Sequence, residues 1–166
     1  MKKTTNSINR FIVKSLLLSL LLISFIVNPM KVSAELAETE INGGMINASS
    51  EFLRDLDYET WQLVAYKSPI NNDKLILRVI GYPGSLRIDH PLDLKVVSGR
   101  KEWLLADKTL LNDELAKDNR QAAAEFDLAQ LVGDISQNRP LRLSLEGVFS
   151  ELPVPPFLVK EWRSLN

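Results

Sequence analysis

Apolar and polar residues alternate with a period of two along much of the chain after residue 45. Side chains two residues apart lie on the same face of a β-strand, so this pattern predicts strands that each bury one face. The intervening segments 69–73 and 81–84 are rich in Pro, Gly, Asn and Asp, which favour turns. The alternating runs lie at 61–66, 75–80, 85–88, 92–96, 103–105 and 141–145.

A different spacing appears between residues 107 and 135. Leucines at 110, 111 and 115, and apolar residues at 128, 131, 132 and 135, have the three- and four-residue spacing of a helix;. Asp127 can cap the second of these segments, and Gly133 ends it early. We therefore expect one or two short helical turns here. For the Ala-rich segment Arg120–Glu125, which connects the two, the pattern predicts neither a helix nor a strand.

These elements predict a mainly β protein. About seven to eight short strands at roughly ten-residue spacing are typical of a single antiparallel β-sandwich or barrel. A parallel sheet would need helices between most strands. We assign this domain to residues 45–166 and a flexible lead-in to residues 35–44. The prolines after residue 152 favour an extended chain at a sheet edge, and Phe157–Trp162 is interpreted as a final strand.

The first 34 residues have the layout of a signal peptide. A basic segment precedes an apolar run at 15–27, and Val32-Ser33-Ala34 supplies small residues before a cleavage site;. As a helix the run covers only about 20 Å of a hydrocarbon layer of about 30 Å. We expect cleavage after Ala34. The alternative is an uncleaved anchor, which would be the only membrane contact, and in both cases the domain lies outside the cytoplasm.

Composition excludes several chemistries. The 166 residues contain no cysteine, which rules out disulfides, thiolate zinc sites and iron–sulfur clusters;. Residues 1–34 hold five basic side chains and no acidic one, so the remainder carries a net charge of −6. That charge argues against nucleic acid or anionic lipid as a partner. No cofactor and no metal ligand is predicted.

The single histidine, His90, is the strongest candidate for catalysis, with Asp89 as a possible orienting carboxylate;. Adjacent residues of an extended chain point to opposite faces, which argues against this pair. No Gly-x-Ser-x-Gly motif supplies a nucleophile. We favour a structural histidine before Pro91 and predict no catalytic residue.

The proline-rich segment at 152–162 is a candidate docking edge for a partner, because rigid apolar segments lose little entropy on binding. The alternative interpretation is an edge strand whose prolines prevent aggregation. The residues of this candidate edge are Pro153, Pro155, Pro156, Phe157 and Trp162. Trp61, Trp103 and Trp162 are otherwise expected in the core or at its rim.

Several motifs occur in an order that resembles a known family. They are Ile80-Gly81-Tyr82-Pro83-Gly84, Asp89-His90-Pro91-Leu92, Glu125-Phe126-Asp127-Leu128, Pro140-Leu141-Arg142-Leu143 and the segment 152–162. The sequence is similar in these to an exported cyanobacterial family, domain-of-unknown-function family 3122. The resemblance covers about Met45 to Trp162. It implies a cyanobacterial source and export to the periplasm or the thylakoid lumen, and it brings no activity or catalytic residue.

The sequence favours an exported, non-catalytic accessory or binding protein of the thylakoid lumen or periplasm that docks on a membrane complex. A carrier of an apolar ligand in a β-barrel is the second hypothesis, since small barrels can hold one such molecule. A hydrolase that uses His90 is the third, and it ranks last because the site lacks a nucleophile.

Overall fold

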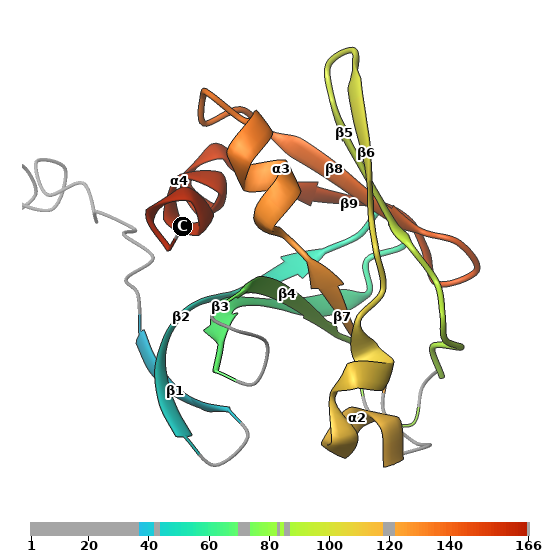
Figure 1. Ribbon diagram of the computed structural model, residues 1–166. Coiled ribbons are helices and arrows are strands. Elements are labelled where there is room, and N and C mark those ends of the chain that lie inside the picture. Colours follow the sequence, from blue (N-terminus) through green and yellow to red (C-terminus); the bar gives the residue numbers. More distant parts are fainter. Residues whose placement is uncertain are drawn as a thin grey trace, which may run out of the picture. The chain divides into compact units, whose positions relative to one another are not determined.

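Two antiparallel sheets face each other across a shared core in the computed structural model (Figure 1). The structure describes residues 37–41, 44–69, 74–82, 84, 87–117 and 122–165, with side chains from residue 46 onward. The first sheet has the order β1-β2-β3-β4-β7, and the second has the order β6-β5-β8-β9. A mainly β antiparallel sandwich with short helices is thereby confirmed, and the sheets do not close into a barrel.

The strand bounds follow the alternation of the sequence in most places. The strands are β1 (Ala37–Ile41), β2 (Gly44–Arg54), β3 (Thr60–Ser68), β4 (Lys74–Ile80), β5 (Leu94–Ser98), β6 (Lys101–Leu105), β7 (Ala123–Asp127), β8 (Leu141–Leu145) and β9 (Phe149–Val154). The helices are η1 (Thr109–Leu111), α2 (Asp113–Lys117), α3 (Ala129–Asp134) and α4 (Pro156–Ser164). The predicted signal peptide at 1–34 lies outside the described residues.

β1, β2, β7 and most of β9 lie outside the alternating runs of the sequence, and the run predicted at 85–88 forms no strand at its described residues, Arg87 and Ile88. β1 lies within the segment 35–44, expected to be a flexible lead-in, and pairs in register with β2 from Ala37↔Ala48 to Ile41↔Gly44. β7 lies at the end of the Ala-rich segment and pairs with β4. Both depend on a neighbouring strand for their hydrogen bonds, which local propensity does not report.

The final strand predicted at Phe157–Trp162 is wrong, because this segment is the helix α4. Pro155 has extended dihedrals (φ −73°, ψ 155°) and precedes Pro156 at the first helical turn, where a missing N–H costs nothing;. The apolar side chains of α4 then fall on one side of the helix and join the core: Leu158, Val159 and Trp162. The prolines that suggested an extended edge thus begin a helix.

The short helices between β6 and β8 match the expectation from spacing. The Asp127 carboxylate accepts a hydrogen bond from the Ala129 N–H at 3.1 Å, and α3 ends at Asp134, one residue after Gly133. Leu131 and Val132 of α3 are buried. Figure 1 shows α3 and α4 toward one end of the domain and α2 toward the other. No helix in the described part of the chain is long and apolar enough to cross a bilayer.

The three tryptophans all lie in the core, as the sequence suggested. Trp61 and Trp162 are 2% and 0% exposed, and Trp103 is 9% exposed. Trp61 packs against Phe149 of the opposite sheet, with ring centroids 4.9 Å apart. Its Nε1–H donates to the Asp55 carboxylate at 2.8 Å. Trp162 Nε1, in contrast, has no hydrogen-bond partner among the described residues.

This difference predicts unequal costs for two matched substitutions. We expect Trp61→Phe to lower the free energy of unfolding by about 2 kcal/mol more than Trp162→Phe, because only Trp61→Phe leaves one oxygen of a buried carboxylate without its donor;. Urea unfolding of both variants measures the difference. Equal losses would show that the Asp55 contact contributes nothing to stability.

Candidate functional site

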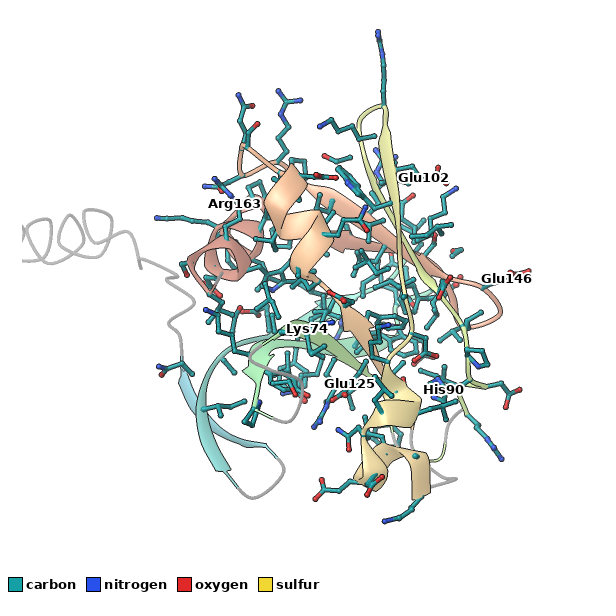
Figure 2. All side chains as sticks on the ribbon, in the orientation of Figure 1. Lys74, His90, Glu102, Glu125, Glu146 and Arg163 are labelled. Carbon is teal, nitrogen blue, oxygen red and sulfur yellow. The ribbon has the colours of Figure 1, made fainter. Side chains whose placement is uncertain are left out.

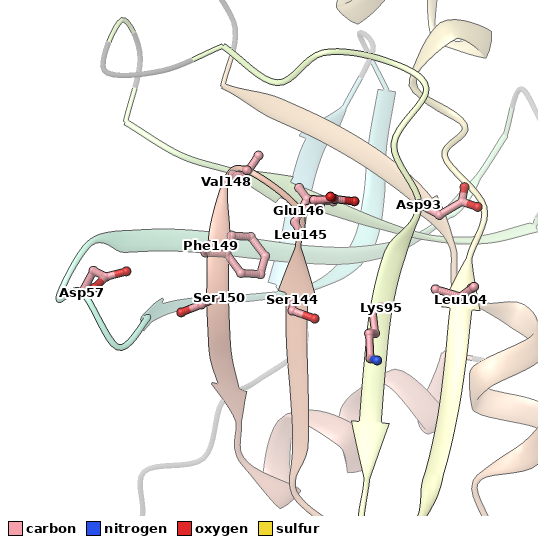
Figure 3. Close-up of a pocket in the computed structure, with 11 residues that line it drawn as sticks. Asp57, Asp93, Lys95, Leu104, Ser144, Leu145, Glu146, Val148, Phe149 and Ser150 are labelled. Atoms are coloured by element: carbon pink, nitrogen blue, oxygen red, sulfur yellow. The ribbon is translucent and has the colours of Figure 1, made fainter.

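The outer face of the second sheet is not covered by any described helix. Lys95, Leu104, Ser144 and Ser150 alternate with buried neighbours on β5, β6, β8 and β9, so they point away from the core;. Register places Lys95 opposite both Leu104 and Ser144. Figure 3 shows the four side chains in a row across the sheet. The two short serines lie side by side on β8 and β9, next to the longer Lys95, and leave a hollow.

That hollow is an open groove of about 500 Å³. Its lining residues are Asp57, Asp93, Lys95, Leu104, Ser144, Leu145, Glu146, Gly147, Val148, Phe149 and Ser150. The groove therefore combines apolar surface with three carboxylates and one ammonium group.

The charges of the groove do not balance. Lys95 Nζ lies 2.9 Å from a carboxylate oxygen of Glu102, next to the groove on β6. Asp57, Asp93 and Glu146 come from three different turns or loops and make no ion pair with another described residue. Figure 2 shows Glu146 pointing away from the body of the domain. The groove thus has an acidic rim, since its one cation is already neutralised.

The β2–β3 turn, Asp55–Glu59, borders this groove through Asp57. The Leu56 N–H donates to the Glu151 carbonyl of β9 at 3.2 Å, which holds the turn against the second sheet. Leu56 and Tyr58 are nevertheless 59% and 80% exposed. We call the groove residues together with this turn the open face.

Tyr58 has a backbone conformation that is unusual for its residue type. Its φ is +66°, in the left-handed region where a Cβ is unfavourable;. A residue with this conformation in a short hairpin loop is commonly glycine. The Asp55 carboxylate fixes the turn by accepting hydrogen bonds at 2.9 Å from the N–H groups of Asp57 and Glu59. Neither Leu56 nor Tyr58 has a sequence signal that marked it beforehand.

The docking edge predicted from the prolines is only partly at the surface. Pro153 is exposed on β9, Pro156 is exposed at the start of α4, Pro155 is half-buried and Phe157 is 38% exposed. Trp162 is fully buried and takes no part in a surface contact. The residues of this edge do not form one extended strand, because β9 ends at Val154 and α4 follows.

His90 pairs with a carboxylate, though not with Asp89. Its Nδ1 lies 2.6 Å from Asp107 Oδ2, while Asp89 is an exposed residue that pairs with Arg87 at 3.6 Å. A carboxylate only accepts hydrogen bonds, so Nδ1 carries the proton in this pair. The peptide bond from His90 to Pro91 is cis. Asp89 and His90 do not pair with each other, which agrees with the expectation that adjacent side chains point in different directions.

The Asp107 carboxylate accepts hydrogen bonds from several surrounding residues. Besides His90, it accepts from the Leu92 N–H at 2.9 Å and from both the N–H and the hydroxyl of Thr109, at 2.8 and 2.5 Å. Burial acts to raise the pKa of Asp107, but the hydrogen bonds from Thr109, His90 and Leu92 outweigh it and hold the pKa below its ordinary value. The side chain is 2% exposed.

The lowered pKa of Asp107 predicts a pH-dependent contribution to stability. Its carboxyl group takes up a proton more readily in the unfolded chain, so the stabilisation is complete above about pH 4 and is lost as pH falls through the folded-state pKa. We expect Asp107→Asn to destabilise the protein at neutral pH and to flatten the stability profile below about pH 5. Urea unfolding at a series of pH values measures this.

Asp89→Asn is the matched control, because the Asp89 side chain is 93% exposed. It should leave the profile unchanged. An Asp107→Asn profile that stays parallel to the wild type would contradict the prediction.

A second buried cluster lies toward the η1–α2 end of the domain, where Figure 2 labels Glu125 and His90. Glu125 Oε1 accepts from Arg78 Nε at 2.8 Å, from Asn112 Nδ2 at 3.1 Å and from the Tyr66 hydroxyl. Arg78 also forms an ion pair with it at 2.6 Å. Burial, followed by the hydrogen bond to Glu125, raises the pKa of Tyr66, which therefore remains a neutral donor.

This cluster connects β3, β4 and β7 with the segment that enters α2, which indicates a structural role. We expect Glu125→Gln to lower the free energy of unfolding by about 3 kcal/mol, because it leaves the Arg78 guanidinium without its counter-charge. The double variant Glu125→Leu/Arg78→Met should cost less than Glu125→Gln. Chemical denaturation of both tests this, with exposed Glu114→Gln as control. A double variant less stable than Glu125→Gln would overturn it.

The described residues contain no group of three or more His, Cys, Asp or Glu side chains that could hold a metal ion. The described residues form a small antiparallel β-sandwich with buried polar clusters around Asp107 and Glu125 and with an open groove that has an acidic rim.

A family model described as "Protein of unknown function (DUF3122)" matches residues 34–165. The chain belongs to this family, as the motifs indicated. No curated protein and no solved structure matches it.

Proposed function

We propose that this protein is an exported, non-catalytic accessory protein that docks on a membrane complex through its open face. The observation that carries the proposal is the groove on the outer face of the second sheet, with Leu104 62% exposed in its lining and with Leu56 and Tyr58 exposed on the turn that borders it. Exposed apolar side chains gathered at one place and surrounded by polar groups are typical of a protein-binding surface.

The other two hypotheses have less support from the geometry. A carrier of an apolar ligand would hold it between the sheets, but Trp61, Trp162 and Phe149 from both sides of the sandwich meet in one packed core. A hydrolase would use His90, whose Asp107 partner is also hydrogen-bonded to Leu92 and Thr109. These contacts of Asp107 favour a loop-fixing role.

The sequence supports a place of action outside the cytoplasm. A basic segment, a short apolar run and Val32-Ser33-Ala34 support export;. The family resemblance adds the periplasm or the thylakoid lumen as destinations. An exported protein of this size that acts as an accessory subunit would be retained by binding to a larger assembly.

The test is whether the protein migrates with a large complex. We expect a protein tagged after Asn166 to co-migrate with an assembly when gently solubilised membranes of the organism that encodes it are separated under native conditions. Ser144→Arg, which fills the groove, and Leu104→Ser should each weaken binding to the assembly at least about tenfold, corresponding to about 1.4 kcal/mol, and so lower the co-migrating fraction.

Leu110→Ser is the matched control, because Leu110 is 58% exposed on η1 and does not line the groove. It should co-migrate like the wild type. A wild-type protein that runs only at the mass of one domain would refute the proposal. Co-migration that Ser144→Arg and Leu104→Ser leave intact would refute the assignment to the open face.

A further inference from the structure

We infer that the open face recognises a lysine- or arginine-containing segment of a partner protein, and that Tyr58 is the anchor of this contact. The inference rests on the proposed function and deepens it by naming the chemistry of the partner. It depends on three features of the described residues: the unpartnered sheet face with its groove, the charge of the groove rim and the conformation of Tyr58.

The charge of the rim selects a cationic partner. Asp57, Asp93 and Glu146 line the groove, and its Lys95 is already paired with Glu102. A neutral or anionic segment would bury these carboxylates without compensation, which is costly. A lysine or arginine side chain supplies the missing charge, and its apolar stem suits the exposed Leu104 beside the acids;.

The same charges argue against a second copy of this chain as the occupant. An isologous dimer through the open face would bring each set of three carboxylates toward its own equivalent. Like charges that face each other across an interface oppose association. The open face is therefore better suited to a basic partner than to itself.

Tyr58 supplies the aromatic part of the surface. Its side chain is 80% exposed and has no hydrogen bond or ring contact with other described residues. A tyrosine that adopts a left-handed backbone costs stability, and its side chain makes no hydrogen bond or ring contact with other described residues that would offset that cost;. The exposed ring of Tyr58, on the same turn as Asp57, can accept a cation over its face;.

The turn that carries Tyr58 is held in place before any partner arrives. Asp55 is 7% exposed and receives hydrogen bonds from two N–H groups of the turn and from Trp61 in the core. The hydrogen bond from Leu56 to Glu151 attaches the turn to β9. Binding to a pre-organised turn loses little conformational entropy, which suits an anchor residue.

Replacement of Tyr58 separates its contribution to binding from its contribution to folding. Tyr58→Gly and Tyr58→Asn suit the left-handed backbone, so each should raise the Tm by about 2–4 °C. Both should also weaken binding at least about fivefold. Tyr58→Phe keeps the ring and should bind like the wild type. A loss of binding in a more stable protein cannot come from misfolding.

The probe for binding is a peptide of eight residues in which lysine alternates with serine. A matched peptide has glutamate in place of every lysine. Titration into the purified full chain, followed by NMR of the backbone amides, shows where each peptide binds. We expect the lysine peptide to shift the amide signals of Asp57, Tyr58, Asp93 and Glu146, and the glutamate peptide to shift none of them.

The salt dependence of binding tests the electrostatic part of the inference. The affinity for the lysine peptide should fall at least about fivefold between about 0.05 and 0.5 M salt. Asp57→Asn combined with Glu146→Gln should lower the affinity and reduce this salt dependence, whereas Glu114→Gln, on α2, should change neither.

Three results would overturn the inference. The first is equal or absent binding of the two peptides, and the second is unchanged binding by Tyr58→Gly. The third is concentration-dependent self-association that shifts the same amides without a peptide. None of these results concerns co-migration with a membrane complex. A protein that co-migrates but ignores the lysine peptide would refute the inference and leave the proposed function in place.

Discussion

The carboxylate of Asp55 joins the hydrophobic core to the exposed β2–β3 turn. One of its oxygens accepts from the indole N–H of Trp61, and the other accepts from the N–H groups of Asp57 and Glu59. Hydrogen bonds to a charged group contribute about 1.5–3 kcal/mol each, and a buried carboxylate without donors would be strongly destabilising. The position of the turn, and with it the edge of the groove, is thus fixed by the same group that orients a core tryptophan.

Two other buried carboxylates hold loops or helices in place in the same way. Asp107 fixes the loop around His90 to the start of η1, and Glu125 fixes the sheet to the segment that enters α2. Each buried carboxylate receives at least three hydrogen bonds from residues that are distant in the chain or lie in turns. In a domain without disulfides, such hydrogen bonds to charged groups help to hold the loops against the sheets.

Period-two alternation was sufficient to predict the mainly β class and most strands, because it directly reports which face of a strand is buried. It was not sufficient for β7, whose alanines carry little hydrophobic signal and whose strand depends on pairing with β4. It was also misleading for α4, because Pro155 and Pro156 favour an extended edge and a helix start equally well. The partner of His90 could not be found either, since Asp107 lies 17 positions away and meets it only after folding.

The position of α4 has a consequence for how the chain acquires its structure during synthesis. Leu158, Val159, Trp162 and Leu165 all belong to the core, and Ser49 of β2 donates a hydrogen bond to Glu161 across 112 positions at 2.6 Å. A ribosome releases the chain from the N-terminal end, so both sheets emerge while this part of their interior is still empty. The domain can complete its core only after residue 165 has left the ribosome.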